Sequence, residues 1–174
     1  MDIKELPLEH LDVEAFILQQ IEEIRGTVGN GTAVNALSGG VDSSVVTLLA
    51  HRALGNRLKS YFIDSGLMRR DEPRQIAAWF KELGISVQII DAQDDFFDAL
   101  AGLTDPEEKR EAITQTFYKQ VFGRIVRESG APFLFQGTNY TDVEETVAKI
   151  KRQHNVLEQL GIDPQKHFGY RIIE

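Results

Sequence analysis

The sequence predicts an α/β protein in which helices cover both faces of a parallel β-sheet. Short apolar segments alternate with helix-length amphipathic segments along the 174 residues. Each apolar segment runs into a turn rich in Gly, Ser or Asp, as buried strands of parallel sheets do. An apolar content of 42% with only five prolines is typical of a compact domain. Because parallel strands need long crossovers, this order of segments implies right-handed βαβ units.

Four segments have the length and composition of buried strands. They span residues 33–37, 58–63, 86–91 and 133–136. In open parallel sheets, ligands bind beyond the carboxyl ends of the strands, at the switch point. We therefore expect the functional residues to follow these segments, at residues 38–44, 64–66 and 136–138 together with Asp142.

Helices are predicted between the strands from apolar residues at 3.6-residue spacing. They span about residues 12–26, 42–54, 72–83 and 105–130. Asp105-Pro106 starts the longest helix well, since Pro suits the first helical position and acids suit the first turn. Gly84 and Gly130 are suited to end two of these helices. A further apolar patch, expected to belong to the core, consists of Phe96, Phe97, Leu100 and Leu103.

The turn after the first strand reads Ser-Gly-Gly-Val-Asp-Ser-Ser over residues 38–44 and predicts a phosphate site. Gly39 and Gly40 allow a tight turn and a close backbone approach to a ligand. The helix that follows points its unpaired amides and the positive end of its dipole at the turn. The alternative is an ordinary helix cap, which one Ser or Asp would supply. The turn lacks the lysine of a Walker A loop.

Asp42 is a candidate metal ligand within this turn. Its carboxylate would repel a bare phosphate, and a Mg²⁺ ion between the two would remove that repulsion. The sequence therefore predicts a site for a nucleotide with Mg²⁺.

Composition excludes several other classes of protein. The chain has no cysteine, so it has no disulfide or thiolate metal site. A net charge of −8 disfavours nucleic acid as the main partner. The chain contains no run of 18 apolar residues, so no membrane span is predicted. Residues 1–7 lack the apolar core of a signal peptide. We expect a cytoplasmic protein.

The Ser-Gly-Gly-Val-Asp-Ser-Ser turn resembles the pyrophosphate loop of the N-type (PP-loop) ATP pyrophosphatases, which cut ATP between its α- and β-phosphates. Three further segments are similar to the ATP-pyrophosphatase part of the GMP synthase family. They are Phe62-Ile-Asp-Ser-Gly-Leu-Met-Arg69, Ala101-Gly-Leu-Thr-Asp-Pro-Glu-Glu-Lys-Arg110, and Gln136-Gly-Thr138 with Asp142-Val143. The resemblance runs in order over about residues 16–156.

The resemblance implies a fold, a reaction and partners. The fold is a three-layer α/β sandwich with a parallel, Rossmann-like sheet of the adenine nucleotide alpha hydrolase type. The reaction is adenylation of the C2 oxygen of xanthosine monophosphate (XMP), followed by attack of ammonia to give GMP and AMP in purine nucleotide biosynthesis. ATP and Mg²⁺ are the implied cofactors. Ammonia would come from a separate glutamine amidotransferase subunit, and a homodimer is also among the expected assemblies.

The resemblance also assigns roles to individual residues. Those expected to bind ATP or pyrophosphate are Ser38, Gly39, Gly40, Val41, Asp42, Ser43, Ser44, Ile63, Asp64, Ser65, Gly66, Gln136, Gly137 and Thr138. Asp42 and Asp142 would hold the metal, and Asp42 and Lys151 would act in catalysis. Arg69, Lys149, His154 and Asn155 are candidates for the acceptor site or its lid.

Two departures from the family pattern leave alternatives open. The lid segment reads Ile150-Lys-Arg-Gln-His-Asn-Val-Leu-Glu158 and lacks the two glycines usual there. We expect one ATP-pyrophosphatase domain over residues 1–174, in which residues 143–174 are an altered lid segment and the start of a missing C-terminal dimerisation region. The chain is then either a fragment or a divergent relative. The alternatives are a PP-loop enzyme with another acceptor, or a non-catalytic nucleotide-binding module.

Overall fold

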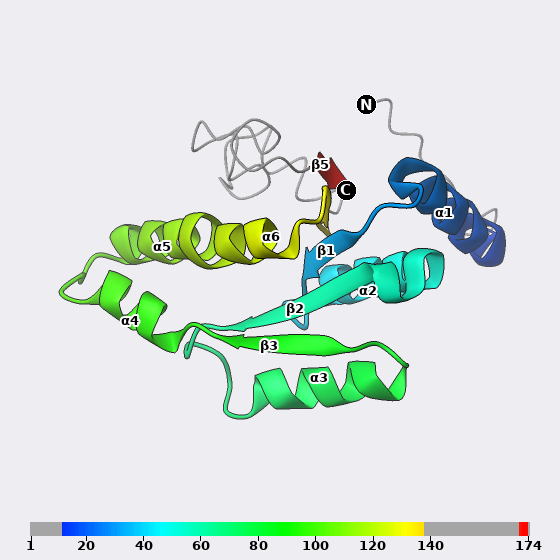
Figure 1. The fold of residues 1–174 in the computed structure, drawn as a ribbon. Coiled ribbons are helices and arrows are strands. Elements are labelled where there is room, and N and C mark those ends of the chain that lie inside the picture. Colours follow the sequence, from blue (N-terminus) through cyan, green and yellow to red (C-terminus); the bar gives the residue numbers. More distant parts are fainter. Residues whose placement is uncertain (1–11, 138–170, 174) are drawn as a thin grey trace.

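The computed structural model describes residues 12–137 and 171–173, which form a parallel five-stranded sheet with helices on both faces (Figure 1). The strand order is β3-β2-β1-β4-β5, and every neighbouring pair is parallel. The strands are β1 (Ala33–Ala36), β2 (Leu58–Asp64), β3 (Val87–Asp91), β4 (Phe133–Phe135) and β5 (Arg171–Ile173). The predicted α/β fold class is confirmed.

The helices follow the strands in alternation. They are α1 (Val13–Val28), α2 (Val41–Leu54), α3 (Glu72–Glu82), α4 (Gln93–Leu100), α5 (Pro106–Gln115) and α6 (Gly123–Ser129), with the 3-10 turn η2 (Gly55–Arg57) and the π-helical segment η3 (Thr116–Phe122). In Figure 1, α5 and α6 lie on one side of the sheet and α3 on the other. None of the helices in the described ranges is long and apolar enough to cross a membrane.

Alternating side chains of the strands build a separate core on each face of the sheet. Val34 of β1 and Ile63 of β2 pack with η3 and α6, where Val121 is fully buried. Their neighbours Ala33 and Phe62 face the opposite side, toward α1, α2 and α3. This period-2 alternation fixes the register of each strand, because a slip of one residue would exchange the two faces.

The predicted helix over residues 105–130 begins as expected but is not uniform. The Asp105 carboxylate accepts hydrogen bonds from the amides of Glu107 and Glu108, at 2.8 and 3.0 Å, and Pro106 is the first helical residue. The middle of the helix widens into η3, which residue spacing alone does not indicate. Burial there raises the pKa of the Tyr118 hydroxyl above its ordinary value of 10.0.

Two elements were not predicted. Helix α4 replaces the expected apolar patch: Phe96 is buried in the core, but Phe97 is 48% exposed, so the expectation of core burial was wrong for that residue. Strand β5 extends the sheet beside β4, where Ile172 packs on one face and Ile173 on the other. Three residues are too few to show a strand pattern in the sequence.

Candidate functional site

The candidate site lies at the carboxyl edge of the sheet, where the strand order reverses. Strands β2 and β3 lie on one side of β1, and strands β4 and β5 lie on the other. The chain therefore leaves β1 and β4 in opposite directions, and in open α/β sheets ligands bind beside the segments that follow such strands. Those segments are residues 37–40 and 136–137, where the sequence predicts a phosphate site.

Of the two loop glycines, Gly39 occupies a position that needs glycine. Gly39 has φ +80°, in the left-handed region, and a Cβ there would lie 3.1 Å from Cδ1 of Ile76 on α3. Gly40 is the N-cap residue of α2 and has an ordinary extended backbone, with φ −73°. The chain thus turns sharply at Gly39 and enters α2 at Val41.

Gly40, the N-cap residue of α2, has no side chain that could cap the helix. The hydroxyls of Ser43 and Ser44 both donate to the Gly40 carbonyl, at 3.1 and 2.7 Å. The Ser38 and Ser43 hydroxyls lie 3.0 Å apart. The prediction of a phosphate at the amino end of this helix stands beside the cap alternative, and the N-cap residue itself supplies no capping side chain.

Asp42 lies in the first turn of α2, one residue beyond the start of the helix. It is not the N-cap, so its carboxylate does not have the ordinary capping role. In the described ranges, no group of three or more His, Cys, Asp or Glu side chains could hold a metal ion. A Mg²⁺ ion here would take most of its ligands from phosphate and water, which is how Mg²⁺ commonly binds.

Gly137, after β4, packs directly against the first turn of α2. A Cβ on Gly137 would lie 2.9 Å from the Asp42 carbonyl carbon and 3.1 Å from the Ser43 amide nitrogen. The preceding residue, Gln136, donates its amide to the Ile173 carbonyl of β5 at 3.0 Å. The end of β4 is therefore in contact with the loop, as the sequence predicted from the strand ends.

The turn after β2 is held by its own side chains. The Asp64 carboxylate accepts from the Gly66 amide at 2.9 Å and from Nε2 of Gln93 at 3.3 Å. Gly66 has φ +72°, and a Cβ there would lie 2.6 Å from the Phe97 ring. Because the turn already uses the Asp64 carboxylate, a nucleoside in this turn would be bound through backbone groups and the flanking Ile63. Sequence reasoning missed Gln93 and Phe97, which α4 brings to this turn.

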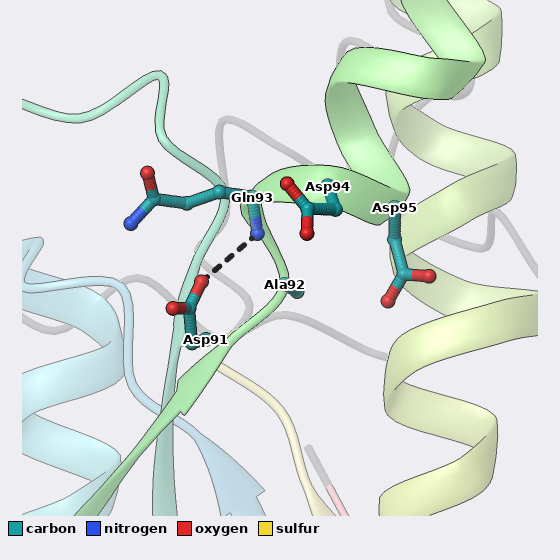
Figure 2. A pocket seen from close by; sticks show the side chains of 5 residues that line it. All are labelled: Asp91, Ala92, Gln93, Asp94 and Asp95. Atoms are coloured by element: carbon teal, nitrogen blue, oxygen red, sulfur yellow. Dashed lines mark hydrogen bonds between the residues drawn. The ribbon is translucent and has the colours of Figure 1, made fainter.

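A cavity of about 420 Å³ opens beside that turn, at the end of β3 (Figure 2). Its lining consists of Asp91, Ala92, Gln93, Asp94 and Asp95. The Gln93 side chain points away from Asp94 and Asp95 in Figure 2, and the backbone amide of Gln93 donates to Asp91 at 3.2 Å. Three carboxylates disfavour phosphate, so the loop before α2 is a better candidate for an anion site than this cavity.

The remaining predicted residues are placed only in part. Arg69 lies between β2 and α3, where its amide donates to the Glu72 carboxylate at 3.0 Å. The other six lie outside the described residues: Thr138, Asp142, Lys149, Lys151, His154 and Asn155.

A five-stranded parallel sheet with a glycine- and serine-rich loop at the β1–α2 junction is the architecture of the PP-loop ATP pyrophosphatases. The sequence model described as asparagine synthase matches residues 28–137, which include this loop and four of the strands. The chain belongs to the family that this asparagine synthase model describes.

Curated relatives confirm the resemblance drawn from the motifs. The chain is 51% identical over 146 residues to one subunit of the glutamine-hydrolyzing GMP synthase of Archaeoglobus fulgidus, covering 84% of this chain and 47% of the relative. It is 49% identical over 162 residues to the corresponding protein of Pyrococcus furiosus, covering 92% and 50%. The chain thus spans about half the length of the curated relatives it matches.

Solved structures support the fold. A U34-tRNA thiolase, NcsA, from Methanococcus maripaludis has a TM-score of 0.63 at 22% identity and covers 92% of this chain and 59% of its own. An NH3-dependent NAD synthetase from Campylobacter jejuni has a TM-score of 0.63 at 15% identity and covers 92% and 80%. At these identities the likeness concerns the fold alone.

Proposed function

We propose that this chain is the ATP-binding and adenylating part of a GMP synthase. The single observation that supports this most strongly is the amino end of α2, where the N-cap residue is Gly40 and residues 38–44 supply two glycines and three hydroxyls. The identity of 51% to a GMP synthase subunit over 84% of the chain supports the choice of reaction.

In the proposed reaction, ATP binds with its β- and γ-phosphates at the loop. The first amides of α2 point at those phosphates, and the helix dipole favours their negative charge. The hydroxyls of Ser38, Ser43 and Ser44 are within reach of the same phosphates once they leave the Gly40 carbonyl or each other. The turn after β2 holds the adenosine through its backbone.

Asp42 fits a Mg²⁺ ion that travels with ATP. The ion is bound in many nucleotide enzymes by one or two carboxylates together with substrate phosphates. When bound, Mg²⁺ neutralises the charge that develops as the bond between the α- and β-phosphates breaks. Asp42 would keep the ion beside the amino end of α2, and Asp142 is the second predicted ligand.

The acceptor in this proposal is XMP. Its C2 oxygen attacks the α-phosphorus, pyrophosphate leaves, and ammonia then displaces AMP to give GMP. The relatives are each named as one subunit of a glutamine-hydrolyzing enzyme, which supports a separate glutamine amidotransferase as the source of ammonia. Lys151, Lys149, His154, Asn155 and Arg69 remain the predicted lid and acceptor residues.

Two measurements test this proposal. Calorimetry with ATP, in the presence of Mg²⁺ and then of EDTA, is expected to show binding that depends on the ion. Release of pyrophosphate is expected to rise when XMP and ammonium are added. Absence of MgATP binding would overturn the nucleotide site. Binding with pyrophosphate release that ignores XMP would overturn the acceptor and favour another PP-loop reaction.

A further inference from the structure

A buried polar chain links the interior of the sheet to the phosphate loop. Asn35 of β1 is 1% exposed, and Thr47 of α2 is fully buried. Nδ2 of Asn35 donates to Oγ1 of Thr47 at 2.6 Å, and Oγ1 of Thr47 lies 2.6 Å from the Ser43 carbonyl oxygen. Ser43 is a residue of the loop, so β1 is connected to the loop through two side chains.

The direction of these hydrogen bonds follows from the chemistry of a hydroxyl. Thr47 has one hydroxyl hydrogen, and a carbonyl oxygen can only accept, so that hydrogen points to Ser43. The hydroxyl oxygen must then accept from Asn35, which requires the amide nitrogen and not the amide oxygen to face Thr47. Asn35 thereby fixes the hydroxyl in the rotamer that bonds to the loop.

This arrangement leaves buried polar atoms without partners. Oδ1 of Asn35 and Oγ of Ser60, its register neighbour on β2, have no hydrogen-bond partner in the part of the chain that the structure describes. Apolar side chains at the same positions would avoid that loss, because removing both partners of a buried bond can be nearly neutral. Stability alone therefore does not account for the pair.

We propose that Asn35 and Thr47 are positioning residues for the phosphate loop. Asn35 orients the Thr47 hydroxyl, which holds the Ser43 carbonyl and so the direction of the first amides of α2. This inference rests on the proposed function of the loop as an ATP site, and it adds that the affinity of the loop depends on two side chains that do not touch the nucleotide.

Three variants of the pair and one control test this inference. Thr47→Val keeps the shape and removes the hydroxyl, whereas Thr47→Ser keeps the hydroxyl. The double variant Asn35→Leu/Thr47→Val removes both members of the Asn35–Thr47 hydrogen bond and strands neither, so it serves even where Thr47→Val does not fold. Ser60→Ala is the matched control, because it removes a buried hydroxyl on the same face of the sheet that does not reach the loop.

Binding of MgATP by calorimetry is expected to weaken about three- to tenfold in Thr47→Val and in the double variant, because a smaller fraction of molecules has the competent loop. The KM for ATP should rise by the same factor at an unchanged kcat. Thr47→Ser and Ser60→Ala should stay within about twofold of the parent. Parental affinity in the double variant, or no rescue by serine, would overturn the proposal.

A second readout needs no nucleotide. Exchange of the Ser44 amide, which donates to the Gly40 carbonyl at 3.1 Å, is expected to be faster in the double variant than in the parent, while exchange in β1 is unchanged. If the parent binds no MgATP, the proposed function fails, and this exchange measurement still decides whether the pair holds the loop. Equal exchange in the two proteins would overturn the positioning role.

Discussion

Replacing Gly137 with alanine should disturb the phosphate loop from the neighbouring strand. The new Cβ would lie 2.9 Å from the Asp42 carbonyl carbon, whereas ordinary contacts begin at 3.4 Å. Both groups belong to the backbone, so α2 or the end of β4 must move by about half an ångström. Overpacking of this kind typically costs about 1–3 kcal/mol of stability. The same methyl would lie 3.1 Å from the Ser43 amide nitrogen, one of the groups offered to phosphate.

The displacement should weaken nucleotide binding as well as the fold. If a shift of about 1 Å costs roughly a hundredfold in a positioned site, half of that shift costs about tenfold. We expect Gly137→Ala to bind MgATP about tenfold more weakly by calorimetry and to melt at a lower temperature by about 2–4 °C per kcal/mol lost. Gly26→Ala in α1 is the control, because a Cβ there meets nothing within 4 Å. Parental affinity in Gly137→Ala would refute the contact between β4 and the loop as a determinant of the site.

The remaining predictions concern the loop and the aromatic segment. Gly40→Val should fold, because Gly40 has φ −73° and a Cβ there would meet only Ser38 Oγ, at 3.4 Å. The variant should nevertheless lose ATP binding. Equal ATP affinity of the variant and the parent by calorimetry would contradict the loop assignment. Asp42→Asn should reduce the Mg²⁺ dependence of ATP binding with little change in melting temperature, since Asp42 is not the helix cap; unchanged Mg²⁺ dependence would remove Asp42 from the metal site. Burial raises the pKa of Tyr118 above 10.0, so this group stabilises the fold below pH 10.0 and loses that contribution as the pH rises through its raised pKa. Tyr118→Phe should therefore lessen the alkaline loss of stability that pH-dependent melting measures. An identical alkaline loss in the variant and the parent would contradict the burial effect.

The sequence predicted most of the fold because its signals are local. Apolar segments of four to six residues gave four of the strands to within one residue at each end. Asp105 gave the start of α5 for the same reason, since a cap and a proline act within one turn. The position of the phosphate loop followed from its glycines and hydroxyls, which need no tertiary information.

The parts that were missed depend on contacts distant in the sequence. Strand β5 has three residues and becomes a strand only because β4 offers it an edge. Gln93 and Phe97 reach the turn after β2 because β3 ends beside it and α4 starts there. Asn35 looked like one polar residue in an apolar strand, and its partner Thr47 stands twelve positions away.

The amino end of α2 combines a structural disadvantage with a functional advantage. A Ser or Asp cap in place of Gly40 would gain only a few tenths of a kcal/mol over glycine, although loss of a cap to alanine typically costs about 1 kcal/mol. A capping side chain would also occupy the amides that a phosphate needs. The serines of the loop instead donate to the Gly40 carbonyl, so they stabilise the turn without covering those amides. Glycine at the cap therefore costs little stability, and it places no side chain over the amides that a phosphate would need.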